Sequence, residues 1–291
     1  MLRDSDSSRL AIMVDRSSRI KLSAGQISWR EAGDDRRPAL IFLHGSWHDR
    51  RQWDRAIDLL SKDFHCLAID LLGFGNSTAI ETPNSIEMEV DCLHEFITAL
   101  NLRQVYPIGH SLGAWIAVSY ALKYPKLVKG VVTISPEGFS RSNRQYNLGT
   151  KWLLSHPVIF ELWLNSLQAM VSIGDSAALA KSLADWNFYK RFPTTCKLLF
   201  QRSNRDLDRE LVADRLAQFR VPLLILQSDR ASRQTIDRSQ VDASNISRSE
   251  YKLIAESESA SPQELMVQMA IEIQTFLNRL QLQVDRSEVE L

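Results

Sequence analysis

Short apolar runs alternate with stretches of helical periodicity along most of the chain. Runs rich in β-branched residues that stop at glycine or polar residues predict strands. The predicted strands comprise residues 9–14, 19–32, 38–45, 65–70, 104–109, 128–135, 221–228 and 250–256. Apolar residues recur at helical spacing in residues 50–62, 85–100, 112–124 and 262–283. Strands that alternate with helices in this way indicate a mainly parallel sheet built from βαβ units.

The parallel pattern stops between residues 136 and 215. This stretch is rich in Trp, Leu and Arg, and it predicts several helices. Because it interrupts a parallel sheet, we interpret it as a lid over the carboxyl ends of the strands, where such sheets bind ligands. The predicted organisation is a core of residues 1–135 and 216–291 with a helical lid of residues 136–215. The alternative is a helical subdomain with only a packing role.

Within the predicted lid, residues 152–173 are heavily apolar and are split by Pro157. Packing onto the core is the simpler explanation of this surface. The more specific interpretation is that this stretch binds an acyl chain or a membrane surface, so that the lid makes peripheral membrane contact.

Charge and cysteine usage narrow the function classes. Lys plus Arg and Asp plus Glu both total 35, so the formal net charge is zero and nothing suggests a nucleic-acid partner. Three widely spaced cysteines form neither a disulfide framework nor a metal-ligand pattern. The polar N-terminus is no secretory signal, and no apolar run reaches ~18 residues. We expect a soluble, cytoplasmic protein with no metal and no cofactor.

One short motif carries the chemistry. Residues 109–113, Gly-His-Ser-Leu-Gly, fit G-x-S-x-G between a predicted strand and a predicted helix. Such a sharp turn needs residues with almost no side chain at Gly109 and Gly113, and it exposes the hydroxyl of Ser111. The N–H of Leu112 and the positive end of the helix then stabilise a developing oxyanion.

A second loop complements this turn. His44 and Gly45 close the strand predicted at 38–45, and Ser46 follows them. The N–H of Ser46 is therefore the predicted second oxyanion donor. We expect His44 to hold the loop by hydrogen bonds and not to act in the chemistry.

Four segments of the chain resemble the α/β-hydrolase superfamily: HGSWHDRRQW, AIDLLGFGNS, YPIGHSLGAWIAVSYALKYP and VPLLILQSD. The resemblance covers about residues 20–280. It implies an α/β-hydrolase fold, with a mostly parallel eight-stranded sheet flanked by helices and a helical lid inserted after the sixth strand. It also implies a Ser–acid–His triad with Ser111 as the nucleophile.

The resemblance also places the acid of the triad. The family's acid follows the strand at 221–227, where Asp229 stands, and Asp237 and Asp242 are weaker candidates. Glu137 follows the strand at 128–135 and occupies the position that some members use instead.

The histidine of the triad has no counterpart. In the family it lies in the loop before the last helix, and here that loop reads ESESASPQEL. The six histidines are His44, His48, His65, His94, His110 and His156, so none follows residue 156. A serine hydroxyl is a poor nucleophile without an adjacent base. An enzyme that loses one triad member still accelerates the reaction about 10³- to 10⁴-fold over the rate in water.

Four residues are candidates for a replacement base or for the pocket wall. His48 lies beside the predicted oxyanion donor, His156 lies in the predicted lid, and Glu256 and Glu258 flank the position without its histidine. Two functions are therefore predicted. The first is a serine hydrolase that acts on a carboxylic ester, small or lipid-like, with an atypical triad. The alternative is a catalytically inactive binding or scaffold protein on the same fold.

Overall fold

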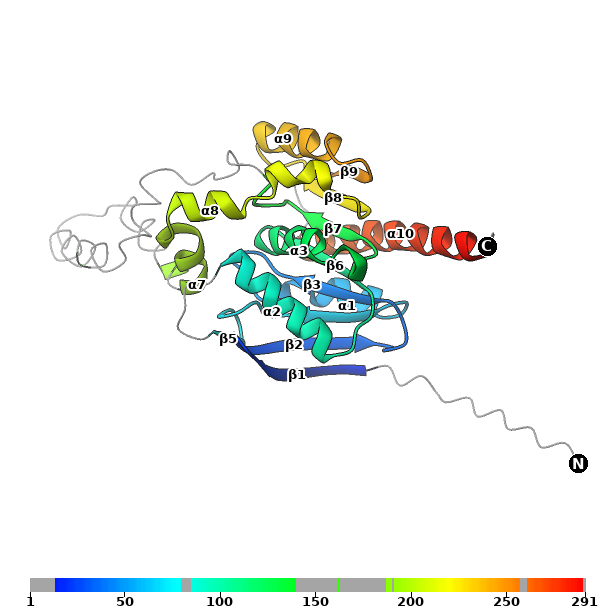
Figure 1. Cartoon of the computed structure of the whole chain (residues 1–291), viewed down its shortest axis with the longest axis horizontal. Coiled ribbons are helices and arrows are strands. Elements are labelled where there is room, and N and C mark those ends of the chain that lie inside the picture. The colour runs from blue at the N-terminus through cyan, green and yellow to red at the C-terminus, as the bar shows by residue number, and fades with distance from the viewer. Residues whose placement is uncertain are drawn as a thin grey trace, which may run out of the picture.

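The computed structural model describes residues 14–79, 85–139, 162, 187–189, 191–256 and 261–289. A single sheet organises them, with strand order β1-β2-β4-β3-β6-β7-β8-β9 and a short β5 paired to β2 (Figure 1). The strands from β4 to β9 along this order run parallel, and β1 and β2 are antiparallel to their neighbours. This is the α/β-hydrolase arrangement, and the predicted mostly parallel sheet is confirmed.

The strands of this sheet are β1 (Val14–Leu22), β2 (Gly25–Gly33), β3 (Ala39–Leu43), β4 (His65–Ile69), β5 (Thr78–Ala79), β6 (Val105–His110), β7 (Val131–Ile134), β8 (Leu223–Ser228) and β9 (Ser249–Ile254). The described helices are α1 (Asp54–Leu60), α2 (Ile86–Ala99), α3 (Leu112–Lys123), α7 (Pro193–Cys196), α8 (Asn204–Glu210), α9 (Arg233–Ser244) and α10 (Pro262–Val289). Short helical turns cover Arg50–Trp53, Pro125–Leu127, Lys197–Gln201 and Ala213–Gln218.

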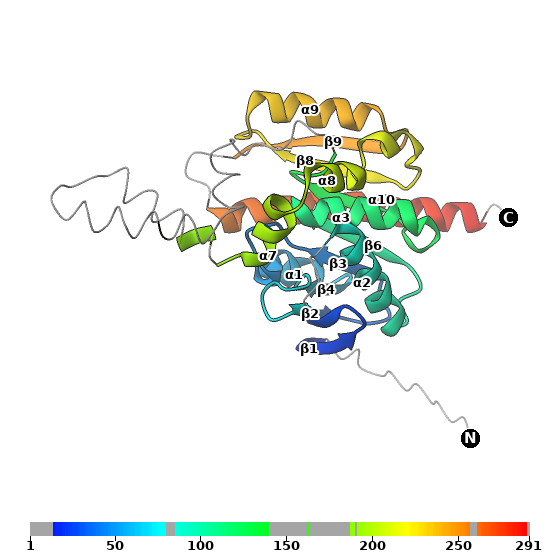
Figure 2. The ribbon, with the colours of Figure 1, turned by 60° about the vertical axis from the view of Figure 1, so that its left-hand side comes forward.

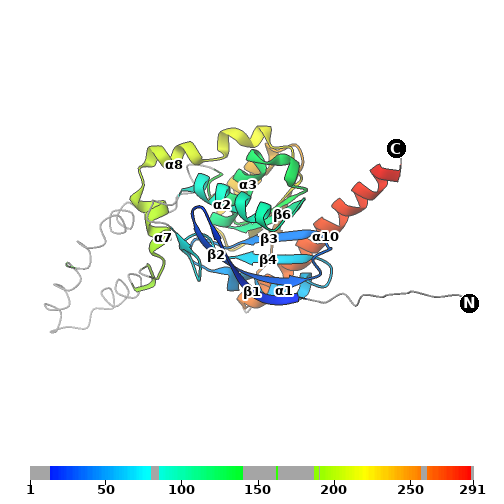
Figure 3. The same cartoon turned by 60° about the horizontal axis from the view of Figure 1, so that its bottom comes forward.

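Helices cover both faces of the sheet. Every residue of β3 and β4 is buried, as expected for parallel strands with helices on each side. Helices α2, α3 and α9 contribute to the hydrophobic core on one face, and α1 and α10 to the core on the other. Figure 2 shows α9 outside β9, and Figure 3 shows α10 running away from α7 and α8.

The first two strands differ from the sequence prediction. The predicted strand 19–32 contains a tight turn at residues 23–24, so it is split between β1 and β2. Gly25 after this turn has φ 154°, and a Cβ there would lie 2.1 Å from the carbonyl oxygen of Thr78. The close approach of β5 thus decides where β2 begins, and no local hydrophobic pattern records it. Residues 9–13 lie outside the described residues.

Helix α9 was missed in the sequence. It is largely polar, so it lacks the apolar stripe that predicts a helix. The signal that was available is its N-cap, because the Ser232 hydroxyl accepts a hydrogen bond from the N–H of Thr235 at 3.2 Å.

The predicted lid is described only in part. Between β7 and β8, residues 193–218 contain α7, α8 and two of the short helical turns, and Leu198, Leu207 and Leu216 pack into the core on the α3 face. Counted without the two-residue β5, which was not predicted, this insertion follows the sixth strand. Most of residues 140–190 lies outside the described residues, so the division into core and lid stays a prediction.

Two further features of the described chain bear on the sequence predictions. Cys66, Cys92 and Cys196 are buried free thiols. Among the described helices, none combines the length and the apolar character that a membrane span needs.

Helix α2 buries a carboxyl group in the core. Glu89 is 3% exposed, and one of its carboxyl oxygens accepts a hydrogen bond from the N–H of Leu72 at 3.3 Å. The other oxygen has no partner among the described residues. Burial penalises the charged form and raises the pKa of Glu89 to about 8, so the native protein keeps this carboxyl protonated at neutral pH.

This burial predicts a pH-dependent stability. The unfolded chain releases the Glu89 proton above its ordinary pKa of 4.5, whereas the native chain holds it to about pH 8. The free energy of unfolding therefore falls as pH rises between these values, by about 1.4 kcal/mol for each pH unit. Glu89→Gln should remove this fall and should be the more stable protein at pH 8, as measured by urea unfolding at pH 5 and pH 8. The exposed Glu87→Gln on the same helix is the matched control. Equal pH slopes for wild type and Glu89→Gln would contradict the prediction.

Candidate functional site

Ser111 occupies a strained turn between β6 and α3. Its φ is 52° and its ψ is −111°, a conformation that a non-glycine residue seldom adopts. The surroundings hold it there: its N–H donates to the carbonyl of Ile134 at 2.9 Å. Its carbonyl accepts from the N–H groups of Ala114 at 3.1 Å and of Glu137 at 3.2 Å. The turn is thus fastened both to its own helix and to the segment that follows β7.

The two glycines of the turn have no room for a side chain. A Cβ on Gly109 would lie 2.3 Å from the carbonyl carbon of Gly113. A Cβ on Gly113 would lie 2.2 Å from the carbonyl oxygen of Leu43 at the end of β3. These backbone contacts bring α3, β6 and β3 into close approach at the serine.

The predicted oxyanion donors lie beside this turn. Leu112 is the first residue of α3 and is fully buried, so its N–H lies at the positive end of that helix. β3 pairs with β6 in the register Leu43↔Gly109, which brings the loop with Ser46 next to the serine turn. The hydroxyl of Thr195, from α7, donates to the carbonyl of Ser46.

His44 serves the same loop, as the sequence indicates. Its Nδ1 lies 2.9 Å from the carbonyl oxygen of Gly45, and its Nε2 accepts from the N–H of Leu71 at 3.1 Å. These partners require a neutral ring with the proton on Nδ1. Burial lowers the pKa of His44 to about 4, which keeps the ring neutral.

A carboxyl group lies next to the serine hydroxyl, and it belongs to Glu137. Oε2 of Glu137 accepts a hydrogen bond from the hydroxyl of Ser46 at 3.2 Å. The hydroxyl of Ser111 lies close enough to this carboxyl group to favour its ionised form. Burial raises the pKa of Glu137, and the two hydroxyls partly offset this effect. Of the acids that the sequence offered, Glu137 is the one that the structure brings to Ser111.

Asp229 has other partners. It follows β8 as the sequence predicts, but it is exposed, and its Oδ1 accepts a hydrogen bond from the N–H of Glu256 at 3.0 Å. The Glu256 carboxylate lies 3.6 Å from Nε of Arg230. These contacts link the end of β8 to the loop after β9. The Asp229 carboxylate thus accepts its hydrogen bond from that loop and not from the serine.

The weaker candidates are placed elsewhere or not described. Asp237 and Asp242 lie on α9, where they pair with Arg233 and Arg238 one turn away. Glu258 and His156 lie outside the described residues.

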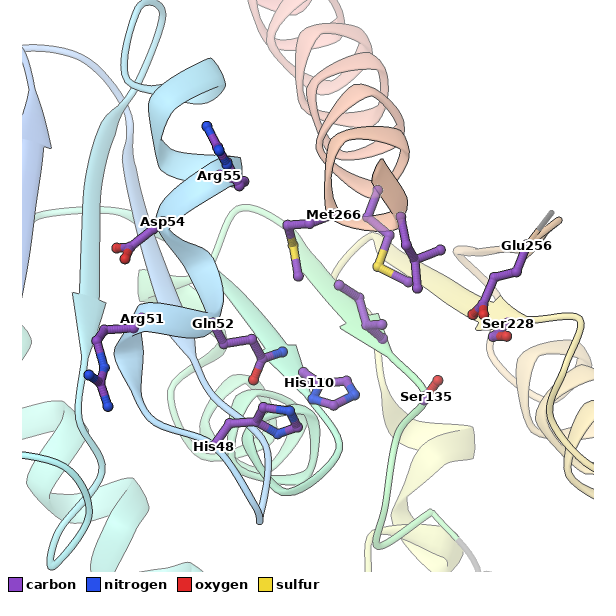
Figure 4. A pocket seen from close by; sticks show the side chains of 13 residues that line it. His48, Arg51, Gln52, Asp54, Arg55, His110, Ser135, Ser228, Glu256 and Met266 are labelled. Atoms are coloured by element: carbon purple, nitrogen blue, oxygen red, sulfur yellow. The ribbon is translucent and has the colours of Figure 1, made fainter. Parts of the chain in front are cut away.

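A cavity of about 520 Å³ opens beside the turn, at the carboxyl ends of β6, β7 and β8 (Figure 4). His48 and His110 lie on one side of it, and Ser228 and Glu256 lie on the other. Its apolar wall consists of Ile134, Leu265, Met266 and Met269. The cavity thus lies between the serine turn and the loop in which the family carries its histidine.

The two cavity imidazoles are held neutral by their surroundings. Their ring centroids are 5.5 Å apart. Burial lowers the pKa of His110 to about 3 and also lowers the pKa of His48. Nδ1 of His110 is buried without a partner among the described residues. No cluster of three or more metal-binding side chains occurs in the described part of the chain.

An aromatic cluster that was not predicted from the sequence covers the oxyanion loop. Trp47 follows Ser46, and its ring centroid lies 5.2 to 6.3 Å from those of Phe188, Tyr189, Phe192 and Phe200. The available signal was the aromatic density of residues 186–192, WNFYKRF. This cluster holds the second half of the insertion against the site.

A family model described as the alpha/beta hydrolase fold matches residues 38–230. The chain belongs to this family. It is 33% identical over 108 residues to a 1-acylglycerol-3-phosphate O-acyltransferase of Arabidopsis thaliana, covering 35% of this chain and 26% of that protein. It is 35% identical over 104 residues to the 1-acylglycerol-3-phosphate O-acyltransferase ABHD5 of Rattus norvegicus, covering 34% of this chain and 30% of that protein. The chain therefore matches less than a third of the length of these curated relatives.

Solved structures of α/β-hydrolases match almost the whole chain. A thermophilic esterase from Thermogutta terrifontis superposes with a TM-score of 0.68 at 18% identity, covering 91% of this chain and 99% of that one. A likeness at this identity concerns the fold alone.

The crowding at the α/β-hydrolase turn predicts that Gly113→Ala is disruptive. The new methyl group would meet the backbone of β3, which cannot yield as a side chain does, at a cost of about 1–3 kcal/mol. Gly130→Ala is the matched control, because its methyl group would meet side chains and no backbone: a terminal carbon of Leu280 at 2.6 Å, and ring carbons of Tyr106 and Phe276 at 3.4 and 3.6 Å. Thermal unfolding should show a clearly larger loss for Gly113→Ala. Comparable losses in the two variants would show that the turn is looser than its distances indicate.

Proposed function

We infer that the protein is a serine hydrolase that acts on carboxylic esters, with Ser111 as the nucleophile. The observation that carries this proposal is the strained backbone of Ser111 at the N-terminus of α3, with φ 52°. The turn itself requires small residues at Gly109 and Gly113, but it does not require a hydroxyl at position 111. A serine held in a costly conformation at the positive end of a helix is what acyl transfer needs.

The proposed oxyanion hole is formed by two backbone N–H groups. Leu112 supplies one at the start of α3, and Ser46 supplies the other from the loop beside it. The hydrogen bond from Thr195 to the Ser46 carbonyl supports the orientation of that loop. Donors fixed in this way stabilise charge on the carbonyl oxygen without reorganising during the reaction. The proposal requires no metal and no cofactor.

A lipophilic acyl ester is the proposed substrate class. The curated relatives are named for the transfer of an acyl group to a glycerol phosphate. In this chain, the aromatic cluster around Trp47 gives the oxyanion loop an apolar cover that suits an acyl chain. The lid contact with a membrane stays a prediction from the sequence, because residues 152–161 and 163–173 lie outside the described residues. The cytoplasmic location also stays a prediction from the sequence.

A second candidate function is a binding or scaffold protein that has lost catalysis. It is favoured by one observation, namely that no histidine follows His156 in the chain. In this case the cavity and the turn would bind a lipid-like ligand without cleaving it. The cellular role would then survive a folded Ser111→Ala variant.

The hydrolase proposal predicts covalent labelling of one residue. A fluorophosphonate probe should label Ser111, and Ser111→Ala should lose both labelling and hydrolysis of p-nitrophenyl esters of medium-chain acids. Ser119→Ala is the matched control: it lies two turns further along α3, and its buried hydroxyl has no partner among the described residues. The control should keep labelling and turnover. Native wild-type protein that is neither labelled nor active would instead support the binding function.

A further inference from the structure

We propose that Glu137 is the catalytic base of this site and takes the proton of Ser111 directly, in place of an imidazole. The proposal deepens the inferred hydrolase function and rests on it. It assigns to Glu137 a contact with the reacting hydroxyl, whereas the family resemblance offers this position only for an acid that supports a histidine.

Two serine hydroxyls act on the carboxyl group of Glu137. Ser46 donates a hydrogen bond to it at 3.2 Å, and the hydroxyl of Ser111 also favours its ionised form. A general base must lie within hydrogen-bonding reach of the proton that it removes. The N–H of Glu137 donates to the carbonyl of Ser111 at 3.2 Å, which holds the two residues side by side, and the hydroxyl of Ser46 keeps the carboxyl group oriented.

The backbone around Glu137 is fixed on both sides. Ser135 before it has φ 44° and Gly138 after it has φ 76°. A Cβ on Gly138 would lie 2.1 Å from the indole ring of Trp115, so only glycine fits there. The carbonyl of Gly138 accepts from the N–H of Val212 at 3.0 Å. Strain of this kind persists only where the surroundings hold it, and here it fixes the position of Glu137 beside Ser111.

The electrostatic surroundings of Glu137 suit a base. Burial raises the pKa of Glu137, which makes its carboxylate a stronger base than an exposed glutamate. The hydroxyls of Ser111 and Ser46 favour the ionised form, so they limit this rise. Burial and these two hydroxyls are the causes of the shift, and no charged side chain among the described residues contributes to it. The carboxylate therefore has no cationic partner there that would weaken it as a base.

The proposed acylation is balanced in protons and charge. The Oγ–H bond of Ser111 breaks, its proton moves to the Glu137 carboxylate, and Oγ bonds to the carbonyl carbon of the ester. The carbonyl π electrons move to the carbonyl oxygen, at the N–H groups of Leu112 and Ser46. The negative charge thus moves from Glu137 to the substrate oxygen, so these two groups are never negatively charged at the same time. The C–O bond to the alcohol then breaks, and the departing alkoxide takes the proton from Glu137.

Deacylation repeats these steps with water. Glu137 removes a proton from a water molecule, whose oxygen bonds to the acyl carbon. The bond between that carbon and Oγ then breaks, and Ser111 takes the proton back from Glu137. The products are a carboxylic acid and an enzyme in its starting protonation state.

The test is Glu137→Gln, which keeps the shape of the side chain and removes the base. We expect hydrolysis of p-nitrophenyl esters and fluorophosphonate labelling of Ser111 to fall by about 10²- to 10⁴-fold. Thermal unfolding should show a folded protein at least as stable as wild type, because a buried carboxyl with a raised pKa becomes a neutral amide. Glu250→Gln, on the outer strand β9, makes the same chemical change and should keep full activity.

Two further measurements separate a base from a structural residue. Ser46→Ala keeps the backbone N–H but removes a hydrogen bond to the ionised carboxylate, so the acidic limb of the pH–rate profile should move to higher pH. Formate should restore part of the activity of Glu137→Ala by entering the space of the missing carboxylate.

Full labelling and turnover in folded Glu137→Gln would overturn the assignment, as would an acidic limb that Ser46→Ala does not move. The same data keep the two proposals apart. If Ser111→Ala is inactive while Glu137→Gln is fully active, the hydrolase function stands and the base is another group. If wild type itself is neither labelled nor active, the hydrolase function fails, and the assignment of the base fails with it.

Discussion

The close approach of three backbones at Ser111 is the constraint on which the site depends. Gly109 and Gly113 leave no space for a Cβ, and Gly113 lies against the carbonyl of Leu43. This contact fixes the end of β3 against the start of α3, so the loop after β3 must lie beside the serine. The strained serine and its two neighbouring N–H groups all lie at that one crowded point, where the close-packed backbone leaves no space for a side chain at either glycine.

Burial determines the charge state around this point. His44 and His110 are kept neutral, and each has a pKa well below the usual value for histidine. Glu137 is shifted in the opposite sense, because burial disfavours the charged form of an acid and of a base alike. For Glu137, the hydroxyls of Ser46 and Ser111 are the groups that favour the ionised carboxylate.

The insertion between β7 and β8 contributes to the site through contacts distant in sequence. Thr195 holds the carbonyl of Ser46, and Thr194 donates to the carbonyl of Gly73 at 2.7 Å. The aromatic rings around Trp47 pack over the same loop. Through these contacts, the second half of the insertion and the oxyanion loop support each other, so changes in the insertion can affect the site without reaching the serine itself.

The sequence by itself determined the alternating strands and helices, the serine turn and the absence of a histidine after residue 156. These features are local, because a sharp turn needs its glycines within a few residues. Only the tertiary structure decided which acid lies beside Ser111. The parallel pairing of β6 with β7 in the register His110↔Ile134 brings Glu137 there, whereas the loop after β9 holds Asp229. That choice, like the start of β2 at Gly25, depends on packing between segments far apart in the chain, which no local pattern records.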